Sequence, residues 1–486
     1  MKRPLVLAFD IGTQSTRVML IDQHGNILSK IQKQYEQPYY SQNPGWAEQN
    51  PSVYWNTMQQ TCNELKKISE NDWEDITCVT CTTIRDTCLC LDSSYSPLRD
   101  VIVWLDKRKA SCCDSIPLIN RILFRLVGMK EAVKLQREVS YCNWIEENQK
   151  EIWDKTNKFV LLSAYLNYLM TGNLIDSKAS SIGHIPFDNK RGDWMRKNDL
   201  TRCIFSVRDD QMCELIDPGE IIGYITKEAS KYLSVPEGLP LIATGSDKGC
   251  ETLGLSVVSE DQAALSFGTT ATIQFMTDKY MEPLPFLPAY SAVLKGYYNP
   301  EIQIYRGFWL VSWFKNQFCD KEKDEAASKS IITEDLLNEK MKDVPAGCDG
   351  LLCNPYFTAG VSMPVAKGAF IGFSDMTTKY HIYRSIIEGI VFALYEGKLV
   401  MERRGRRKIS SLYLAGGGSK SPKICQITAD IFGLPVKTIQ TNEAGALGSA
   451  IVAFTAQKWF KSIQEAIDSM VHIRHVYIPD MKTHDK

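Results

Sequence analysis

Residues 10–17 (DIGTQSTR) place a carboxylate, a glycine, hydroxyls and an arginine directly after a short apolar run at residues 5–9. Such a loop can bind a phosphate group, because a glycine lets the phosphate approach the main chain while the neighbouring side chains donate hydrogen bonds. The expected phosphate-contacting residues are Gly12, Thr13, Gln14, Ser15 and Arg17. Asp10 is expected to hold Mg²⁺ directly or through water. The alternative is an ordinary hairpin turn, and no Walker A loop is present, so a P-loop is not indicated.

A second candidate binding loop is the run Gly416-Gly417-Gly418, which lies between a predicted strand and a predicted helix over residues 421–432. Three glycines let a flat ligand such as adenine or ribose approach the main chain. Ser421 suits the N-cap of that helix and Pro422 its first position, while Gly433 can end it in the left-handed conformation. The alternative is a flexible loop.

Strands and helices must position these loops. Near the N-terminus, apolar segments separated by polar, glycine-containing turns predict a three-stranded meander. Its strands are residues 5–9, 16–22 and 27–35. Helix and strand patterns then alternate, which is typical of an α/β fold. The clearest are a helix over 51–69, a strand over 76–82, a helix over 143–153 and a strand over 239–244.

The pattern of strand, Gly-Thr turn and strand occurs twice. Residues 262–267, the turn Gly268-Thr269-Thr270 and residues 271–276 repeat the opening arrangement. Both copies place main-chain amides and hydroxyls at a tight turn between strands. We therefore predict two related domains, residues 1–250 and 251–486, that face one cleft.

The composition favours a globular protein that binds a small molecule. Of 486 residues, 44% are hydrophobic and 23% are charged, close to the average of soluble domains. Lys and Arg total 56 against 57 Asp and Glu, so no basic field attracts nucleic acid or an anionic membrane. The apolar run at residues 5–9 ends at Asp10, too early for a signal peptide, and we expect a cytoplasmic protein. A homodimer is the oligomeric state that we hypothesise.

The chain has fifteen cysteines, an odd number without a secretory signal, which favours reduced thiols over a disulfide framework. The densest group is Cys78, Cys81, Cys88 and Cys90. Four sulfurs so close together could bind zinc, but Cys78 and Cys81 would point to opposite faces of a strand. Buried free cysteines that act as small apolar residues are the preferred interpretation.

Taken together, several segments resemble the FGGY carbohydrate kinases, members of the actin-like ATPase superfamily. The resemblance runs through DIGTQSTR (10–17), PGWAEQNP (44–51), WLDKR (104–108), GSDK (245–248), GTT (268–270), GLLCNPY (350–356) and GAFIG (368–372). Its most specific part is AGGGSKSP (415–422), followed by GLPV (433–436) and EAGALGSA (443–450). The resemblance implies two actin-like (ribonuclease H-like) α/β domains flanking a deep catalytic cleft, with the sugar held mainly by the N-terminal domain and the nucleotide by the C-terminal one. It also implies ATP and Mg²⁺ as cofactors and phosphoryl transfer to a hydroxyl of a small sugar, sugar acid or polyol.

The resemblance assigns a role to Asp247, which matches the family's general base. A carboxylate at a strand end can accept the proton of the attacking hydroxyl as the γ-phosphoryl group arrives. The alternative is that Asp247 caps the following helix. Asp247 is also expected, with Asp10, to hold Mg²⁺. The nucleotide-contacting residues implied for the second domain are Gly268, Thr269, Thr270, Gly416, Gly417 and Ser421.

The acceptor is expected to be an open-chain polyol, ketose or sugar acid of three to six carbons. Arg85 and Asp86 are similar to the Arg-Glu pair of glycerol kinases, and an adjacent cation and anion can bind neighbouring hydroxyls. The alternative is a surface ion pair or a turn. Glycerol kinases favour Glu at Asp86, Gln at Lys248 and Tyr at Gln136, so a larger acceptor such as xylulose or erythritol stays open. The expected acceptor-binding residues are Arg85, Asp86, Gln136, Asp247 and Lys248.

One departure from the family and two rival functions are relevant. Many relatives carry small residues where this chain has Phe308-Trp309, and their bulk could reshape the adenine pocket. A chaperone ATPase of the same fold would need a peptide-binding region after the ATPase, and the C-terminal motifs leave no room for one. A catalytically silent sugar or nucleotide sensor is the alternative function, but it would be expected to have lost Asp10 or Asp247.

Overall fold

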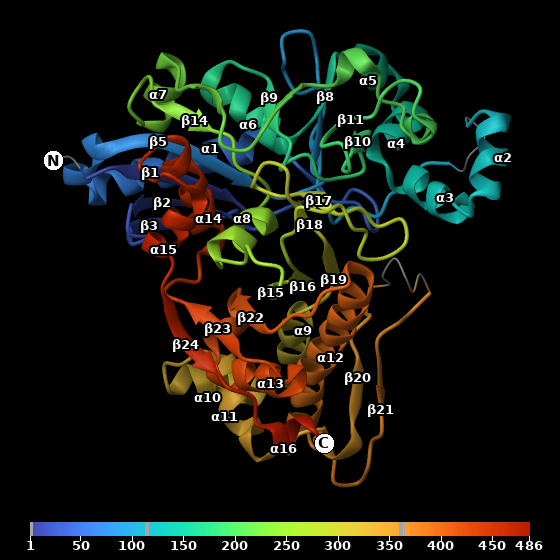
Figure 1. The fold of residues 1–486 in the computed structure, drawn as a ribbon, viewed down its shortest axis with the longest axis vertical. Coiled ribbons are helices and arrows are strands. Elements are labelled where there is room, and N and C mark those ends of the chain that lie inside the picture. Colours follow the sequence, from blue (N-terminus) through green and yellow to red (C-terminus); the bar gives the residue numbers. More distant parts are fainter. Residues whose placement is uncertain (1–2, 112–115, 359–362, 364) are drawn as a thin grey trace. The chain divides into compact units, whose positions relative to one another are not determined.

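The computed structural model describes residues 3–111, 116–358, 363 and 365–486, and Figure 1 shows its ribbon. The chain divides into two compact units. The first comprises Met1–Gly254, Tyr290–Tyr297 and Gly445–Met470, and the second comprises Leu255–Ala289, Tyr298–Ala444 and Val471–Lys486. The first long segment ends close to the boundary expected from the sequence. Two later segments, Tyr290–Tyr297 and Gly445–Met470, also belong to the first unit. The prediction of two uninterrupted domains does not include these returns of the chain.

The first unit contains a six-stranded sheet in the order β13-β14-β5-β1-β2-β3. The strands are β1 (Leu5–Ile11), β2 (Ser15–Asp22), β3 (Ile27–Gln34), β5 (Ile76–Thr83), β13 (Ile221–Tyr224) and β14 (Pro240–Ile242). The antiparallel pairs β1–β2 and β2–β3 confirm the predicted meander. Because β1, β5 and β14 run parallel, their carboxyl ends lie at one edge of the sheet.

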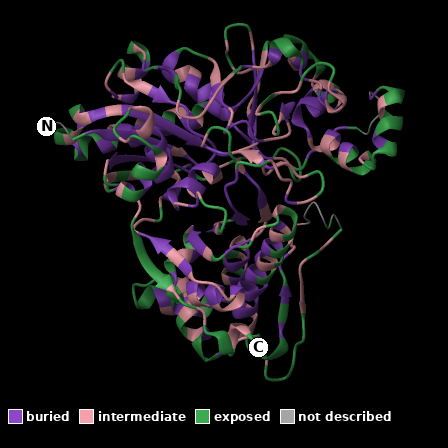
Figure 2. Ribbon diagram, in the orientation of Figure 1, coloured by how far each residue is buried: buried purple, intermediate pink, exposed green. Residues whose placement is uncertain are grey.

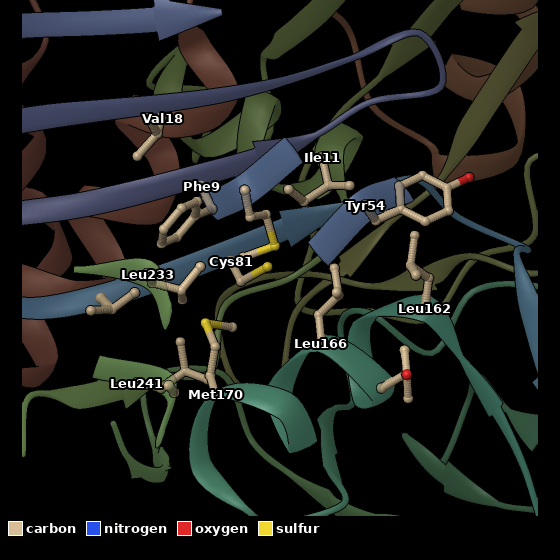
Figure 3. Packing of buried hydrophobic residues seen from close by; sticks show 14 of the residues in the cluster. Phe9, Ile11, Val18, Tyr54, Cys81, Leu162, Leu166, Met170, Leu233 and Leu241 are labelled. Atoms are coloured by element: carbon tan, nitrogen blue, oxygen red, sulfur yellow. The ribbon is translucent and has the colours of Figure 1, made fainter. Parts of the chain in front are cut away.

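Helices cover both faces of this sheet, as the alternation along β5 shows. Val79 and Cys81 point into an apolar core with α1 (Pro51–Ile68), α6 (Leu162–Thr171) and α7 (Lys227–Leu233). Figure 3 shows the α6 side chains of this core beside Cys81. The next residue on the opposite face, Thr80, hydrogen-bonds Ser449 of α14 (Ala444–Ala456) at 3.1 Å. Full burial of a leucine or phenylalanine contributes about 1.5–3 kcal/mol, so this layered core holds the strand edge in place.

The start of α1 illustrates how the local sequence sets an element. The Asn50 side chain accepts the main-chain N–H of Ser52 at 2.9 Å, and Pro51 occupies the first helical position, where no N–H is needed. The helix therefore begins where the PGWAEQNP motif ends.

The first unit also contains a smaller four-stranded sheet, β4-β7-β6-β8, and four short helices between residues 118 and 155. Its strands are β4 (Glu48–Gln49), β6 (Cys88–Leu91), β7 (Val101–Ile102) and β8 (Lys158–Leu161), and the helices are α2 (Leu118–Leu126), α3 (Lys130–Val139), α4 (Tyr141–Asn148) and α5 (Lys150–Lys155). The prediction of one continuous helix over residues 143–153 is wrong, because two helices occupy this segment. Gln149 leaves the helical region at φ −135°, ψ 52°, so α4 and α5 are separate.

The second unit repeats the large sheet, with the order β19-β16-β15-β22-β23-β24. The strands are β15 (Gln262–Phe267), β16 (Ala271–Gln274), β19 (Glu301–Ile304), β22 (Ser411–Ala415), β23 (Val436–Ile439) and β24 (Ile473–Tyr477). Its helices include α9 (Trp309–Phe318), α10 (Asp320–Ser328), α11 (Thr333–Lys340), α12 (Lys379–Gly405) and α13 (Pro422–Phe432).

The segment around the glycine run differs from the predicted open loop. Residues Gly417–Lys420 form a 3₁₀ turn, η6, directly before α13. The predicted limits of α13 are confirmed: the Ser421 hydroxyl accepts the Ile424 N–H at 3.4 Å, and Gly433 ends the helix at φ 61°.

Burial follows the two large sheets, whose central strands are buried in Figure 2. The thiols of Cys78, Cys81, Cys88 and Cys90 are free and buried, and burial raises the pKa of Cys78 to about 12 and that of Cys90 to about 11. These thiols are therefore packing groups, as the sequence favours. Within the described ranges, no helix is both long enough and apolar enough to cross a membrane.

Candidate active site

The carboxyl ends of β1, β5 and β14 gather the ionisable residues that the sequence singled out. Asp10 lies near the end of β1, Arg85 follows β5, and Asp247 opens α8 (Asp247–Gly254) after β14. Arg85 Nε lies 3.8 Å from Asp247 Oδ1, and the two side chains are 17% and 37% exposed. The fold therefore brings the predicted base and one predicted acceptor-binding residue together at a partly open edge.

Asp247 is placed differently from a simple helix cap. The Ser246 hydroxyl accepts the Gly249 N–H at 3.3 Å, so Ser246 provides the side-chain hydrogen bond typical of an N-cap. Asp247 Oδ1 accepts the adjacent Lys248 N–H at 2.9 Å. Because Ser246 already serves the helix end, the Asp247 carboxylate can take part in chemistry as well.

Arg85 has a second neighbour that sequence reasoning missed. Its guanidinium lies over the ring of Tyr290, 5.5 Å from the ring centroid, in a cation–π arrangement. Tyr290 belongs to β17 (Tyr290–Ser291), in a segment about two hundred residues further along the chain that packs in the first unit. No local motif marks it, so only the tertiary fold reveals it.

Asp86 is held tightly by residues of a neighbouring loop. The Asp86 N–H donates to the Ile182 carbonyl at 2.9 Å, and Asp86 Oδ1 accepts the His184 N–H at 2.9 Å. Asp86 Oδ2 lies 2.6 Å from His184 Nδ1. A Cβ on Gly183 would lie 2.6 Å from Asp86 Oδ1, so the close approach requires glycine there.

His184 was not among the residues expected from the sequence. Its side chain is 36% exposed, and its ring packs edge-on against Tyr141, with centroids 6.5 Å apart. Burial by itself would lower the pKa of His184, but the charge of Asp86 and the hydrogen bond to it together raise that pKa above its usual value. The contact with Asp86 therefore stabilises the imidazolium form of the ring.

The two other expected acceptor-binding residues have different settings. Lys248 Nζ lies 3.4 Å from Glu251 Oε1 on the same helix, so its charge is partly balanced. Gln136 is half-exposed on α3, and its main-chain carbonyl accepts a hydrogen bond from the Ser140 hydroxyl at 2.5 Å. Across the described residues, no contact links the Gln136 side chain with Asp86 or Asp247. Its role stays a prediction.

The turn between β1 and β2 has the geometry of a small anion-binding loop. The Gly12 N–H donates to the Ser15 carbonyl at 2.9 Å, which closes the turn. Trp104 Nε1 donates to Thr13 Oγ1 at 2.9 Å, so the Thr13 hydroxyl proton must point elsewhere and can donate to a phosphate oxygen. Ser15 is buried and accepts Gln32 Nε2 at 3.0 Å, which makes it a support of the turn.

The donor set at this edge fits Mg²⁺. Asp10 Oδ2 lies 2.7 Å from Arg17 Nη1, and its side chain is 17% exposed. Mg²⁺ usually takes one or two carboxylates and completes its octahedron with water and phosphate oxygens. Among the described residues, no group of three or more His, Cys, Asp or Glu side chains lies close enough together to hold a metal ion.

In the second unit, a matching turn joins β15 and β16. The Gly268 N–H donates to the Thr270 carbonyl at 3.2 Å, and Thr269 at its tip is exposed. The Phe308 N–H donates to the Gly268 carbonyl at 3.0 Å, which ties the turn to the segment before α9. Thr269 can therefore present its hydroxyl, while Thr270 directs its own toward the Tyr305 carbonyl at 3.5 Å.

The glycine run packs against the same turn. A Cβ on Gly416 would lie 2.7 Å from the Phe267 main chain, and one on Gly418 would lie 2.8 Å from both Phe267 and Phe308. The rings of Phe267 and Phe308 stack with centroids 4.6 Å apart. The bulky Phe308 thus lies beneath η6 and supports the run that carries Gly416 and Gly417. Ser421 is committed to capping α13.

Comparison with known proteins identifies the family of the chain. Residues 5–254 match the N-terminal domain and residues 263–457 the C-terminal domain of the FGGY family of carbohydrate kinases. The chain is 26% identical over 493 residues to a xylulose kinase of Staphylococcus epidermidis, covering 100% of this chain and 94% of that protein. It is 24% identical to a glycerol kinase of Solidesulfovibrio magneticus, covering 99% and 95%.

The fold is also that of a solved kinase. The crystal structure of a gluconate kinase from Lactobacillus acidophilus superimposes with a TM-score of 0.83 at 21% identity, over 99% of this chain and 95% of that one. The expected two-domain, actin-like α/β fold is therefore confirmed. The domain matches span more than half of the sequence, and the chain belongs to the FGGY family of carbohydrate kinases, enzymes that transfer a phosphoryl group to an alcohol group of a sugar or related small molecule.

Proposed function

We propose that this kinase transfers the γ-phosphoryl group of ATP to a hydroxyl of an open-chain polyol, ketose or sugar acid of three to six carbons. The observation that supports the proposal best is the contact of Arg85 with Asp247, 3.8 Å apart at the edge formed by three parallel strands. It places a residue suited to binding hydroxyls beside a carboxylate suited to removing a proton.

In the proposed reaction, Asp247 and Arg85 act on the acceptor. The Asp247 carboxylate accepts the proton of the acceptor hydroxyl as the oxygen attacks the γ-phosphorus. A new P–O bond to the acceptor forms while the bond between the γ-phosphorus and the bridging oxygen of ADP breaks, and ADP leaves with the electron pair. The side chain of Arg85 orients the acceptor, so that the reacting oxygen is held for in-line attack.

For the nucleotide, we propose that Thr13 and Thr269 donate hydrogen bonds to phosphate oxygens from the two Gly-Thr turns. Gly416 and Gly417 would admit the adenosine to the main chain of the glycine run. Asp10 and Asp247 would hold Mg²⁺, partly through water. When bound, the ion supplies charge neutralisation on the phosphate oxygens.

The proposed acceptor class follows from the chemistry of hydroxyl recognition. A small polyol offers only hydroxyls, so selective binding needs paired donors and acceptors that would be left unsatisfied by the wrong ligand. Arg85 and Asp86 supply such a pair. The named relatives act on xylulose, glycerol and gluconate, which are a ketose, a polyol and a sugar acid of three to six carbons.

The test is ADP release from ATP·Mg²⁺ over a panel of acceptors. The panel contains xylulose, ribulose, erythritol, glycerol and gluconate, with glucose and galactose as cyclic controls. We expect saturable turnover with at least one open-chain compound and little with the cyclic aldohexoses. Turnover with only the cyclic sugars would contradict the proposed acceptor class, and no turnover with any compound would support a silent sensor.

A further inference from the structure

We propose that His184 is a further acceptor-binding residue, and that Asp86 acts on the acceptor chiefly by holding the His184 ring. This inference rests on the proposed function, because it concerns the same site. It changes what Asp86 does: the carboxylate becomes a positioning group, and the imidazole provides the contact with an acceptor oxygen.

The Asp86 carboxylate forms its side-chain hydrogen bonds with His184. Both carboxylate oxygens bond to this one residue, Oδ1 to its main-chain N–H at 2.9 Å and Oδ2 to ring Nδ1 at 2.6 Å. The Asp86 side chain is 14% exposed, whereas that of His184 is 36% exposed. A ligand that reaches this edge therefore meets more of the imidazole than of the carboxylate.

The same contacts fix the chemistry of the ring. An ionised carboxylate only accepts hydrogen bonds, so Nδ1 must carry a proton. Nε2 is then an acceptor when the ring is neutral and a donor when it is protonated. No hydrogen bond involving Nε2 is found within the described residues. In either state Nε2 suits a hydroxyl, and in the protonated state also a carbonyl or carboxylate oxygen.

The backbone conformation at Asp86 and Gly183 holds the Asp86 carboxylate against His184. Asp86 adopts φ 49°, a left-handed conformation that is uncommon for an aspartate, and its N–H is anchored to the Ile182 carbonyl. Gly183 has no room for a side chain next to Asp86. Strained backbone concentrates at functional sites, because the surrounding structure must hold it there. The ring is partly exposed and packs edge-on against Tyr141, and a ring held in this way is a preorganised group for ligand binding.

The sharpest test compares His184→Asn with His184→Gln. The Asn amide can replace Nδ1 beside Asp86 but offers nothing at the Nε2 position, while the Gln amide reaches toward the Nε2 position. With the best acceptor of the panel, we expect His184→Asn to raise the acceptor KM at least 10-fold and leave the KM for ATP within 2-fold. His184→Gln should recover part of the loss. His475→Asn, an exposed histidine on β24, is the matched control.

A double-mutant comparison separates holding from direct binding. Asp86→Asn alone should raise the acceptor KM about as much as His184→Asn, and the double variant should be no worse than either single one. Effects that multiply in the double variant would show that Asp86 binds the acceptor independently, and would overturn the proposal. Melting curves accompany each variant, and a loss of more than about 10 °C in both His184 variants would assign a structural role and overturn it as well.

The inference and the proposed function can fail separately. If the wild-type chain phosphorylates an open-chain acceptor but His184→Asn keeps an acceptor KM within 2-fold of wild type, only the role of His184 is wrong. If the wild type phosphorylates none of the panel, the proposed function fails and the role of His184 fails with it.

Discussion

The two large sheets have the same strand order and strand directions but carry different residues at their edges. In the first unit, a parallel trio β1-β5-β14 is extended by antiparallel β2 and β13, and in the second unit β15-β22-β23 is extended in the same way by β16 and β24. At the carboxyl ends, the first trio presents Asp10, Arg85 and Asp247 besides the Gly12-Thr13 turn. In the second trio, β15 is followed by the Gly268-Thr269-Thr270 turn and β22 by the glycine run at 416–418. One backbone plan therefore supports two kinds of chemistry.

The two Gly-Thr turns show this difference at close range. The turn at Gly12 is held by side chains as well as by the main chain. Trp104 bonds to Thr13, the Tyr35 hydroxyl donates to the Gly12 carbonyl at 3.3 Å, and the Tyr35 N–H donates to the Gln14 carbonyl at 2.9 Å. The turn at Gly268 is fastened by main-chain bonds from the segment before α9. We infer that the first sheet edge handles the acceptor and its proton, and that the second mainly handles the nucleotide.

The largest effect is expected at Asp247. We expect Asp247→Asn to lower kcat by roughly 10²- to 10⁴-fold, because an amide cannot accept the hydroxyl proton. The acceptor KM should change little, and the fold should be retained. Steady-state kinetics with the best acceptor measure this, with Asp154→Asn on the exposed face of α5 as the control. Turnover within a few-fold of wild type would refute the base assignment.

The charged edge is probed next by Arg85→Ala. A charge-assisted hydrogen bond contributes about 1.5–3 kcal/mol, so the acceptor KM should rise roughly 10- to 150-fold. The KM for ATP should stay near wild type, since the predicted nucleotide contacts lie in other segments. Arg191→Ala, which removes an arginine paired with Asp188 and Asp199 outside this edge, is the matched control. An unchanged acceptor KM would show that Arg85 does not bind the acceptor and only forms an ion pair with Asp247.

The second unit is probed by Thr269→Val, which removes an exposed hydroxyl at nearly constant volume. Loss of one phosphate contact should cost about 1–2 kcal/mol and lower kcat/KM for ATP roughly 5- to 30-fold, with acceptor affinity unchanged. Thr270→Val is the control, because that hydroxyl faces the Tyr305 carbonyl. Equal effects of both variants would mean that the turn is only structural.

The smallest effect concerns a carboxylate of the first unit that lies away from the strand edge. Burial raises the pKa of Asp176 to about 7, although Ser163 Oγ donates to it at 2.5 Å. The unfolded chain loses this proton near pH 4, so between about pH 4 and 7 the folded state holds a proton that the unfolded state lacks. The free energy of unfolding should therefore fall as pH rises through this window and level off above it.

Asp176→Asn should remove that part of the pH dependence and leave kcat nearly unchanged. Urea unfolding of wild type and variant at pH 5 and pH 8 measures it, and the wild type should lose more stability at pH 8 by about 1 kcal/mol or more. An identical pH dependence in the two proteins would show that Asp176 is ionised in the folded state.

Much of the fold was determined by the local sequence. The meander, the limits of α1 and α13 and the repeated strand–turn–strand pattern follow from apolar periodicity, caps and glycines that act within a few residues. The predicted edge residues Asp10, Arg85 and Asp247 also follow, because each comes at the end of a recognisable strand. The positions of α4 and α5 did not, because the break at Gln149 carries no proline or glycine.

The residues that reach that edge from distant parts of the sequence are set by the packing of the folded chain. Tyr290 reaches Arg85 from a segment that lies beyond the predicted boundary, and His184 reaches Asp86 across ninety-eight positions of sequence. Residues Gly445–Met470 return to the first unit in the same manner. Such contacts depend on how loops and helices pack against the sheets. A lone tyrosine in a two-residue strand, or a lone histidine in a loop, belongs to no periodic pattern that predicts its partner.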